Sequence, residues 1–410
     1  MPTMRAVRSV VGCLLAGAVL AGCAGSQGPA DASGPAPSRT APTATAAPSG
    51  PRPASTTTPP SIGKPISKPR PGATSRPHPP KTAAGVPLAA GNPRGGATVP
   101  AEARAADTSH PARTVGDGTP SGCTSAAVVA AVAAGGVITF DCGPAPVVIT
   151  MTATAKVRNA VPRIVLDGGG KVTLSGGGTR RILSMDTCDQ AQGWTTSHCQ
   201  DQAEPELTVQ NLTFADGNST GNTAEGGGGG AVLVRGGRFK AVNTRFTGNR
   251  CDPTGPDLGG AAIRVLDQYH GLPVYITDST FTGGSCSNGG ALSSIGVSWV
   301  VLNTVMTGNS AVGSGANPAR GGTPGGGSGG AIYTDGNRYT VRVEGSDISH
   351  NDAKEGGGAL FYVSNDRTGT LSIASSTLRA NPSHGFSTAG YPGIFFLGSG
   401  KPAVSGSTLS

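Results

Sequence analysis

Three pairs of polar residues are the candidates for catalysis in this chain of 410 residues. Carboxylate, imidazole and guanidinium groups are among the side chains that move protons or balance charge in enzymes. Each pair follows a Gly-Gly-Ala motif, so aligning these motifs brings the pairs into neighbouring loops that preceding strands would hold rigidly. Polar loops also serve solubility, and no strand carries paired Asp residues, so the pattern is not specific for catalysis. The pairs are Asp267 with His270, Asp335 with Arg338, and Asp366 with Arg367.

Sequence motifs for nucleotides and metals are missing. The Gly226–Gly230 run has no following Lys-Ser/Thr, and Asp167–Lys171 lacks the spacing of a phosphate-binding loop. No Cys or His pair has zinc-ligand spacing, and no acidic run matches a calcium-binding EF-hand. We therefore expect no metal and no cofactor.

Aromatic residues in loops are the candidates for binding, because their rings can stack on sugars. Large insertions fall on one edge of the repeats, at 251–258, 311–328 and 382–392. A lone Trp in a loop also often fills a packing gap, so both interpretations stay open. The candidate binding residues are Trp194, His198, Trp299 and Tyr391.

Net charge and aromatic residues lie in different parts of the chain. The protein has 31 Lys and Arg against 23 Asp and Glu, a formal charge of +8. From Pro120 onward, basic and acidic residues are equal in number, at 19 each, so the net positive charge lies before Pro120. The aromatic residues, in contrast, all lie at or beyond Phe140. A nucleic-acid-binding domain would combine basic charge with aromatic side chains on one folded surface. We therefore expect no nucleic-acid partner.

The N-terminus has the layout of an export signal. Arg5 and Arg8 precede an apolar run that is too short to span a bilayer. The segment ends in Leu20-Ala21-Gly22-Cys23, which resembles the lipobox of bacterial lipoproteins. That resemblance implies cleavage before Cys23 and lipidation of its sulfur; the alternative is an ordinary secretory signal with a chance Cys. Residues 24–119, rich in Pro, Ala, Ser and Thr, cannot form a core and predict a disordered tether.

One short motif recurs about every 30 residues beyond residue 200. It begins with a residue that tolerates a left-handed corner and has a large apolar residue at its fourth position, as in Asn211–Phe214 and Asn243–Phe246. Three residues further comes a second corner. A Gly-Gly-Ala motif follows, ending for example at Ala231-Val232, Ala261-Ala262 and Ala291-Leu292. The predicted structural corners are Asn211, Asn243, Asp278, Asn303, Asn249, Asn309, Asn351 and Asn381.

These features predict an all-β solenoid in which each repeat adds one turn of parallel strands. A β-propeller is the rival fold, but its blades need four strands and a longer period. The spans Phe246–Ile263, Met306–Ile332 and Ile348–Leu360 resemble the repeats of polymorphic outer-membrane proteins and, more broadly, the pectin-lyase-like right-handed parallel β-helix. The resemblance covers residues 207–410 well and 136–185 loosely. A helix over Ser125–Ala134 is expected to cap the first strand edge.

The resemblance implies a fold but no single activity, because the superfamily includes polysaccharide lyases, glycoside hydrolases, adhesins and passive surface proteins. A lyase of this fold would hold Ca²⁺ with clustered carboxylates and use Lys or Arg as its base, and a hydrolase would need two carboxylates at a defined separation. Only in the lyase case would Ca²⁺ be required.

Six cysteines remain after Cys13 and Cys23 are set aside, and in an exported protein they predict disulfides. Cys251 and Cys286 each lie five residues after the apolar residue of a corner motif, so they should stack on adjacent turns about 4.8 Å apart. The other expected pairs are Cys188 with Cys199 and Cys123 with Cys142.

Together these observations predict a signal peptide at 1–22, a lipidated Cys23 and tether at 23–119, and a β-helix domain at 120–410. The chain stops soon after Gly406, so we expect either an exposed C-terminal strand edge that a partner protects or an incomplete chain. The protein would be anchored to the outer face of the cytoplasmic membrane. Its expected role is binding or adhesion to carbohydrate or another surface polymer, with an enzyme or a passive envelope protein as alternatives.

Overall fold

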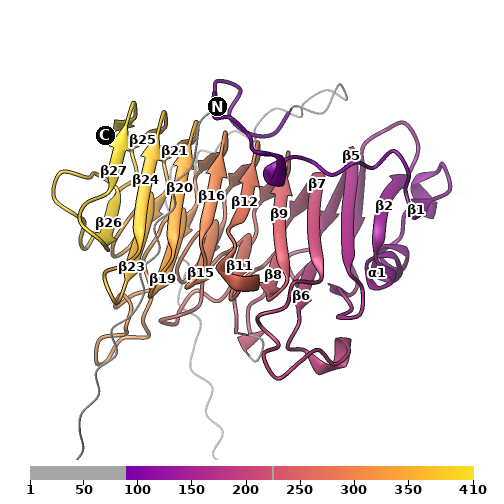
Figure 1. Ribbon diagram of the computed structural model, residues 1–410, viewed down its shortest axis with the longest axis horizontal. Coiled ribbons are helices and arrows are strands. Elements are labelled where there is room, and N and C mark those ends of the chain that lie inside the picture. Colours follow the sequence, from indigo (N-terminus) through magenta and orange to yellow (C-terminus); the bar gives the residue numbers. More distant parts are fainter. Residues whose placement is uncertain (1–88, 224–225) are drawn as a thin grey trace, which may run out of the picture. The chain divides into compact units, whose positions relative to one another are not determined.

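Parallel β-strands stacked into long sheets form the solenoid (Figure 1). This computed structural model describes residues 89–223 and 226–410. The named strands all pair in parallel, and each chain segment returns to the same face one turn later. The all-β solenoid expected from the repeat is confirmed at this level.

The first face carries the groove described below. Long strands β5 and β7 continue around a corner into the second face, and the ladder between them is interrupted after Asp167. The strands of the first face are β1 (Arg113–Gly116), β2 (Gly136–Asp141), β5 (Arg163–Ser175), β7 (Glu206–Ala215), β9 (Arg238–Val242), β12 (Val274–Thr277), β16 (Trp299–Leu302), β20 (Thr340–Glu344), β24 (Thr370–Ala374) and β27 (Ala403–Ser405).

The second face consists of short strands that begin just after the first corner motif. Its strands, beside the ends of β5 and β7, are β3 (Val147–Thr150), β10 (Arg245–Thr247), β13 (Thr280–Thr282), β17 (Val305–Thr307), β21 (Asp347–Ser349), β25 (Thr377–Arg379) and β28 (Thr408–Leu409).

The third face begins at the Gly-Gly-Ala motifs, and a narrow three-stranded sheet lies beside it. The third face has β4 (Ala155–Lys156), β6 (Leu183–Asp186), β8 (Val232–Arg235), β11 (Ile263–Val265), β15 (Leu292–Ile295), β19 (Ile332–Gly336), β23 (Leu360–Ser364) and β26 (Ile394–Leu397). The narrow sheet has β14 (Ser285–Cys286), β18 (Ser310–Ala311) and β22 (Asp352–Ala353).

The strand register confirms the alignment of the corner motifs. Phe214, Phe246 and Phe281 are successive partners, and the series continues through Met306 to Leu409. One detail of the second motif was wrong. Ile263 pairs with Val232 and Leu292, so the residues equivalent to Ala231-Val232 are Ala262-Ile263, one position later than expected.

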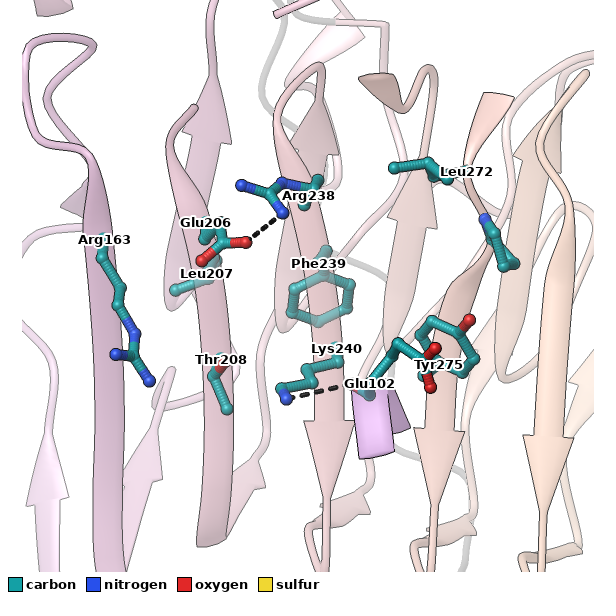
Figure 2. A pocket seen from close by; sticks show the side chains of 11 residues that line it. Glu102, Arg163, Glu206, Leu207, Thr208, Arg238, Phe239, Lys240, Leu272 and Tyr275 are labelled. Carbon is teal, nitrogen blue, oxygen red and sulfur yellow. Dashed lines mark hydrogen bonds and ion pairs between the residues drawn. The ribbon is translucent and has the colours of Figure 1, made fainter. Parts of the chain in front are cut away.

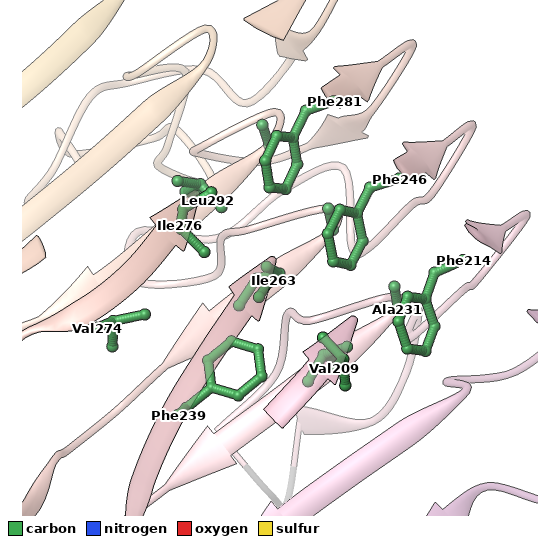
Figure 3. Packing of buried hydrophobic residues seen from close by; sticks show 14 of the residues in the cluster. Val209, Phe214, Ala231, Phe239, Phe246, Ile263, Val274, Ile276, Phe281 and Leu292 are labelled. Carbon is green, nitrogen blue, oxygen red and sulfur yellow. The ribbon is translucent and has the colours of Figure 1, made fainter. Parts of the chain in front are cut away.

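The interior is a continuous apolar core in which like residues stack on like. Figure 3 shows Phe214, Phe246 and Phe281 in a row. Their rings are nearly parallel, with centroids 5.3 Å and 4.6 Å apart. All three are buried, because the fourth position of each corner motif turns inward.

The corners have two different structures. Asn211, Asn243, Asp278 and Asn303 adopt the left-handed conformation, with φ between 47° and 50°. At the second corner the left-handed residue lies one position before the expected Asn. This leaves the Asn side chains free to point inward, where they form a buried ladder. Asn309, Asn351 and Asn381 form that ladder, whereas Asn249 is buried at the same corner two turns earlier and accepts from the Gly217 amide.

Residues 89–112, here called the strap, fold against the outside of the solenoid, and the expectation that the tether extends to residue 119 was therefore wrong. Ala97 exchanges two hydrogen bonds with the side chain of Asn303, and Ala106 exchanges two with Gln210. Gly91 packs so closely that a Cβ would lie 2.6 Å from the carbonyl carbon of Asp278. The strap contains the short helix η1 (Ala101–Ala103).

Helix α1 (Ser125–Ala134) forms where it was expected, with the Thr124 side chain accepting a hydrogen bond from the Ala127 amide at its start. Val128 and Val132 join the solenoid core. The edge of β2, however, is covered by β1 and not by α1, because β1 pairs with β2 in parallel. Strand β1 lies within the segment that was predicted to be part of the tether. The short helix η2 (Pro120–Gly122) precedes α1.

All three expected disulfides are present. Cys251 and Cys286 lie on adjacent turns with Cα atoms 4.8 Å apart, and Cys188–Cys199 closes a loop. Cys123–Cys142 links the segment before α1 to the end of β2. Three disulfides indicate an oxidising environment outside the cytoplasm. The signal peptide, Cys23 and the tether up to residue 88 lie outside the described residues. Within the described chain, no helix has the length and apolarity to cross a membrane.

Candidate functional site

A groove of about 290 Å³ lies on the outer side of the first face, across β5, β7, β9 and β12. Figure 2 shows Arg163 at one side of it and Tyr275 with Glu102 at the other. Helix η1 of the strap contributes Glu102, and the segment before β12 contributes an apolar wall. The groove is therefore bounded by parts of the chain from five separate regions.

Strand alternation puts these side chains on the outside in two rows. Register pairs Arg163 with Glu206 and Glu206 with Arg238, so charges alternate along one row. The second row joins Thr208, Lys240 and Tyr275. Neighbouring members of a row are separated by the strand spacing of about 4.8 Å. The inward residues between the rows, such as Phe239, belong to the core and fix the strands.

Two of the three cations that line the groove are engaged. Arg238 forms an ion pair with Glu206, and its Nε donates to the Ala203 carbonyl at 2.9 Å. Lys240 Nζ donates to the backbone carbonyls of Glu102 and Arg104, at 3.0 Å and 2.7 Å. Burial lowers the pKa of the Lys240 ammonium, and the charges of the Glu206 and Glu102 carboxylates act in the opposite direction.

Arg163 is the cation that remains available. Its side chain is exposed and, within the described residues, makes no ion pair or hydrogen bond. The groove contains the three cations and the carboxylates of Glu102 and Glu206, so its formal charge is +1 in an otherwise neutral domain. This arrangement favours an anionic group near Arg163.

The opposite side of the groove supplies apolar contact. Tyr275 is partly buried, and Leu272 is 44% exposed beside Pro273. Burial raises the pKa of the Tyr275 hydroxyl, so it stays protonated at neutral pH and can donate a hydrogen bond. A chain of rings with apolar faces and polar substituents would meet suitable groups on both sides.

The first pair of catalytic candidates borders a different loop. Asp267 accepts a hydrogen bond from the Gln268 amide, and burial raises the pKa of its carboxyl. The His270 amide donates to Asp201 at 2.7 Å, and its ring lies 3.7 Å from the same carboxylate. His270 is thus tied to the loop that carries Asp201.

The second pair is separate from the first, because β15 lies between β11 and β19. Asp335 accepts hydrogen bonds from Asn317 at 2.7 Å and Asn365 at 3.1 Å, and burial raises the pKa of its carboxyl. Arg338 is exposed and its side chain has no partner within the described chain.

The third pair forms a tight turn. Asp366 accepts hydrogen bonds from the amide and hydroxyl of Thr368 and from the Ser364 hydroxyl. These bonds hold the pKa of its carboxyl below the ordinary value, with the Thr368 amide contributing most. Arg367 occupies the left-handed position of this turn and its side chain is exposed. The loops of the second and third pairs lie on adjacent turns and are joined by the Asn365–Asp335 and Ser364–Asn337 hydrogen bonds, whereas the first pair lies apart from them, beyond β15.

The four binding candidates differ in how far their side chains are buried. The prediction that Trp299 offers a stacking surface was wrong, because this side chain is completely buried and its indole donates to the Ser294 hydroxyl at 2.8 Å. Tyr391 is partly buried against the core. Trp194, in contrast, is 78% exposed, and His198 near it is exposed as well.

The groove residues were not predicted from the sequence, because the candidate sites were sought in loops that follow the Gly-Gly-Ala motifs, whereas these residues lie on the strands that precede the first corners. Glu206, Arg238 and Pro273 each lie five residues before a first corner, and Thr208, Lys240 and Tyr275 lie three before it. That spacing could have revealed both rows. The contribution of Glu102 had no comparable signal, because the strap has no repeat.

The described residues contain no group of three or more His, Cys, Asp or Glu side chains that could hold a metal ion. Comparisons with models of known families, with curated proteins and with solved structures find no match to this chain. The function must therefore be inferred from the groove and its surroundings.

Proposed function

We propose that this protein is a surface-binding module that holds a polymeric carbohydrate, or a similar surface polymer, in the groove across β5, β7, β9 and β12. The observation that carries the proposal is an unpaired, exposed Arg163 facing an apolar wall formed with Tyr275 and Leu272. A polymer of carboxylate-bearing sugars matches both sides, since the anion of one unit suits the guanidinium and the ring face of another unit, three strands away, suits the aromatic side chain.

The solenoid also suits a chain-like ligand. Successive turns repeat the same outward positions about every 4.8 Å, which is close to the length of one pyranose unit. A polysaccharide lying along the solenoid axis would meet one strand per sugar, so the two rows of side chains could contact several units in sequence.

Binding is better supported than catalysis by the positions of the acidic and basic groups. Lys240, the most buried ammonium of the groove, is held by two backbone carbonyls, and Glu206 is paired with Arg238. Both arrangements fix charge in place and suit a site that orients a ligand. The lyase and hydrolase alternatives would gain support if a polysaccharide were cleaved.

The proposal includes the location of the module. We place it outside the cell as a right-handed, pectin-lyase-like β-helix, linked by its N-terminal tether to lipid on Cys23. The support is the lipobox-like sequence before Cys23 and the three disulfides of the folded part.

The test measures binding of the full-length chain to soluble sodium alginate, a polyuronate, and to dextran, an uncharged glucan, by isothermal titration calorimetry. Arg163→Ala should weaken alginate binding about threefold to tenfold, the range for an exposed charge-assisted contact, and added salt should reduce the difference. Arg379→Ala removes an arginine that is also exposed, from the second face, and is the matched control.

Two results would overturn the proposal. One is alginate binding that Arg163→Ala and Arg379→Ala weaken equally, because net charge and not the groove would then explain the affinity. The other is an absence of binding to every soluble polysaccharide tested. Release of an unsaturated or reducing product during the titration would instead favour the enzyme.

A further inference from the structure

Trp194 is the most exposed large apolar side chain of the described residues, at 78%, followed by Val148, Leu272 and Val312. Exposure of an indole leaves a large apolar surface in contact with water. It lies in a loop of 19 residues, 187–205, between β6 and β7, called the stapled loop because Cys188–Cys199 closes it. A surface feature of this kind on an ordered loop calls for an explanation.

The stapled loop is braced from several directions. Asn159 Nδ2 donates to the carbonyls of Thr187, Asp189 and Gly193, the last immediately before Trp194. Arg158 donates to the Ala191 carbonyl at 2.9 Å. The preceding turn of the solenoid therefore supports the segment that leads to the indole.

Further contacts fix the loop internally. The Lys156 ammonium and the Gln192 amide both contact the Asp189 carboxylate, at 3.2 Å and 3.1 Å. Thr195, next to the indole, donates its hydroxyl proton to the Thr187 carbonyl at 3.0 Å. The short helix η3 (Gln190–Gln192) lies within this network. Because the supporting backbone is held before any ligand arrives, little conformational entropy would be lost on binding.

The surroundings of the indole are polar. Gln190, Thr196, Ser197 and His198 are exposed in the same loop, and no second large apolar side chain of the loop is exposed. A protein partner needs roughly 800 Å² per side for a stable interface, whereas one Trp side chain offers about 150–250 Å². A single isolated indole within a polar rim therefore fits a small ring with an apolar face and a polar edge.

We infer that Trp194 is a stacking platform for an uncharged face of a pyranose ring, supported by the stapled loop and distinct from the groove. The base of the loop borders the groove, because Arg238 donates to Ala203 and its amide donates to the Pro205 carbonyl. If the groove binds carbohydrate as proposed above, the platform contacts another unit of the same polymer. The stacking itself requires no charge on the sugar.

Tryptophan fluorescence of the full-length chain offers a direct test. The protein has two Trp residues, and Trp299 is completely buried, so the neutral quencher acrylamide should act mainly on Trp194. Soluble dextran, laminarin, arabinogalactan and alginate are the probes. At least one of these sugars should protect Trp194 from acrylamide, in a saturable way.

Calorimetry with the protecting sugar then assigns the contact. Trp194→Ala should weaken binding about threefold to tenfold, the range for loss of an aromatic contact, and Trp194→Phe should retain most of it because a ring face remains. Ser197→Ala, at an exposed position of the same loop, is the matched control. Circular dichroism checks that the exposed substitutions leave the solenoid folded.

The outcomes separate the two proposals. Alginate binding that depends on Arg163 while Trp194 stays fully quenchable with every sugar would overturn the platform and leave the groove intact. Protection of Trp194 by an uncharged glucan, together with weaker calorimetric binding of that glucan to Trp194→Ala, supports the platform even if Arg163→Ala has no effect. Equal binding by Trp194→Ala and the unaltered chain would also overturn it.

Discussion

Replacement of Asn351 by Ala tests whether the buried asparagine ladder stabilises the solenoid. Asn351 is completely buried at the second corner. Its amide nitrogen donates to the Met306 carbonyl at 2.9 Å and to Asn381 Oδ1 at 3.0 Å. Its oxygen accepts from the backbone and side-chain nitrogens of Asn309, at 3.0 Å and 2.8 Å. One side chain therefore links three successive turns.

The expected loss in the free energy of unfolding follows from these partners. In Asn351→Ala the Asn309 backbone amide is left buried without its acceptor, which costs about 1–3 kcal/mol. The remaining bonds to Asn309, Met306 and Asn381 are each worth about 1 kcal/mol net, and those groups keep some other partners. Because these groups keep other partners, the total loss is expected to stay below the sum of the separate contributions, at about 3–5 kcal/mol.

Urea unfolding followed by the fluorescence of buried Trp299 and by circular dichroism measures this loss. A solenoid can unfold in segments, so the two signals should be compared before a single free energy is derived. Asn337→Ala is the control, because Asn337 is exposed and its side chain has no partner within the described chain. It should change stability by less than about 0.5 kcal/mol.

The reasoning would be refuted if Asn351→Ala destabilised the protein by less than about 1 kcal/mol, the worth of one ordinary hydrogen bond. In that case water or a local shift would satisfy Asn309, and the ladder would be a consequence of the corner geometry and not a cause of stability.

Three further predictions concern the core, the strap and the carboxyls of Asp335 and Asp366. Phe246→Ala removes the middle ring of the Phe stack and should lower the free energy of unfolding by about 3–5 kcal/mol. Val148→Ala, at a site that is 65% exposed, should lower it little. Similar urea midpoints for the two variants would contradict the packing argument. Asn303→Gly keeps the left-handed corner but removes both hydrogen bonds to Ala97, so amide hydrogen exchange in residues 92–104 should become about tenfold faster or more. Ser375→Gly is the control, at an equivalent left-handed position. Unchanged exchange in Asn303→Gly would show that the strap does not depend on this corner. Burial raises the pKa of the Asp335 carboxyl above the ordinary 3.8. The stabilising contribution of this carboxyl is therefore present below pH 3.8 and is lost as the pH rises through the folded-state pKa. Between pH 4 and 7, Asp335→Asn should accordingly gain stability relative to the unaltered protein. Asp366→Asn should show the opposite trend in the same urea titrations, because hydrogen bonds lower the pKa of Asp366, and parallel pH profiles would contradict both assignments.

The repeating part of the fold was predictable because it follows from local constraints. A left-handed corner needs Asn, Asp, Gly or another tolerant residue, and the large apolar residue three positions later must face the core. These two requirements fixed the pairing of Phe214, Phe246 and Phe281 before the structure was known. The Cys251–Cys286 pair followed from the same alignment.

The candidate site was predicted less well. The sequence offered polar loops after the Gly-Gly-Ala motifs, but Asp267, Asp335 and Asp366 lie in separate environments. It also offered two Trp residues without distinguishing them. Trp299 is the first residue of a strand and points inward, whereas Trp194 lies in a braced loop and points into solvent.

The sequence by itself determined the stacking of turns, the corners and the disulfide pairs, because each depends on residue types at short, regular spacing. Only the tertiary structure decided what lies on the outside. The strap has no repeat and binds through corner side chains, such as Asn303 and Gln210, that are far from it in sequence. Its position closes one side of the groove and engages Lys240 while Arg163 stays free. Such contacts join non-repeating segments to repeating ones, so no local pattern specifies them.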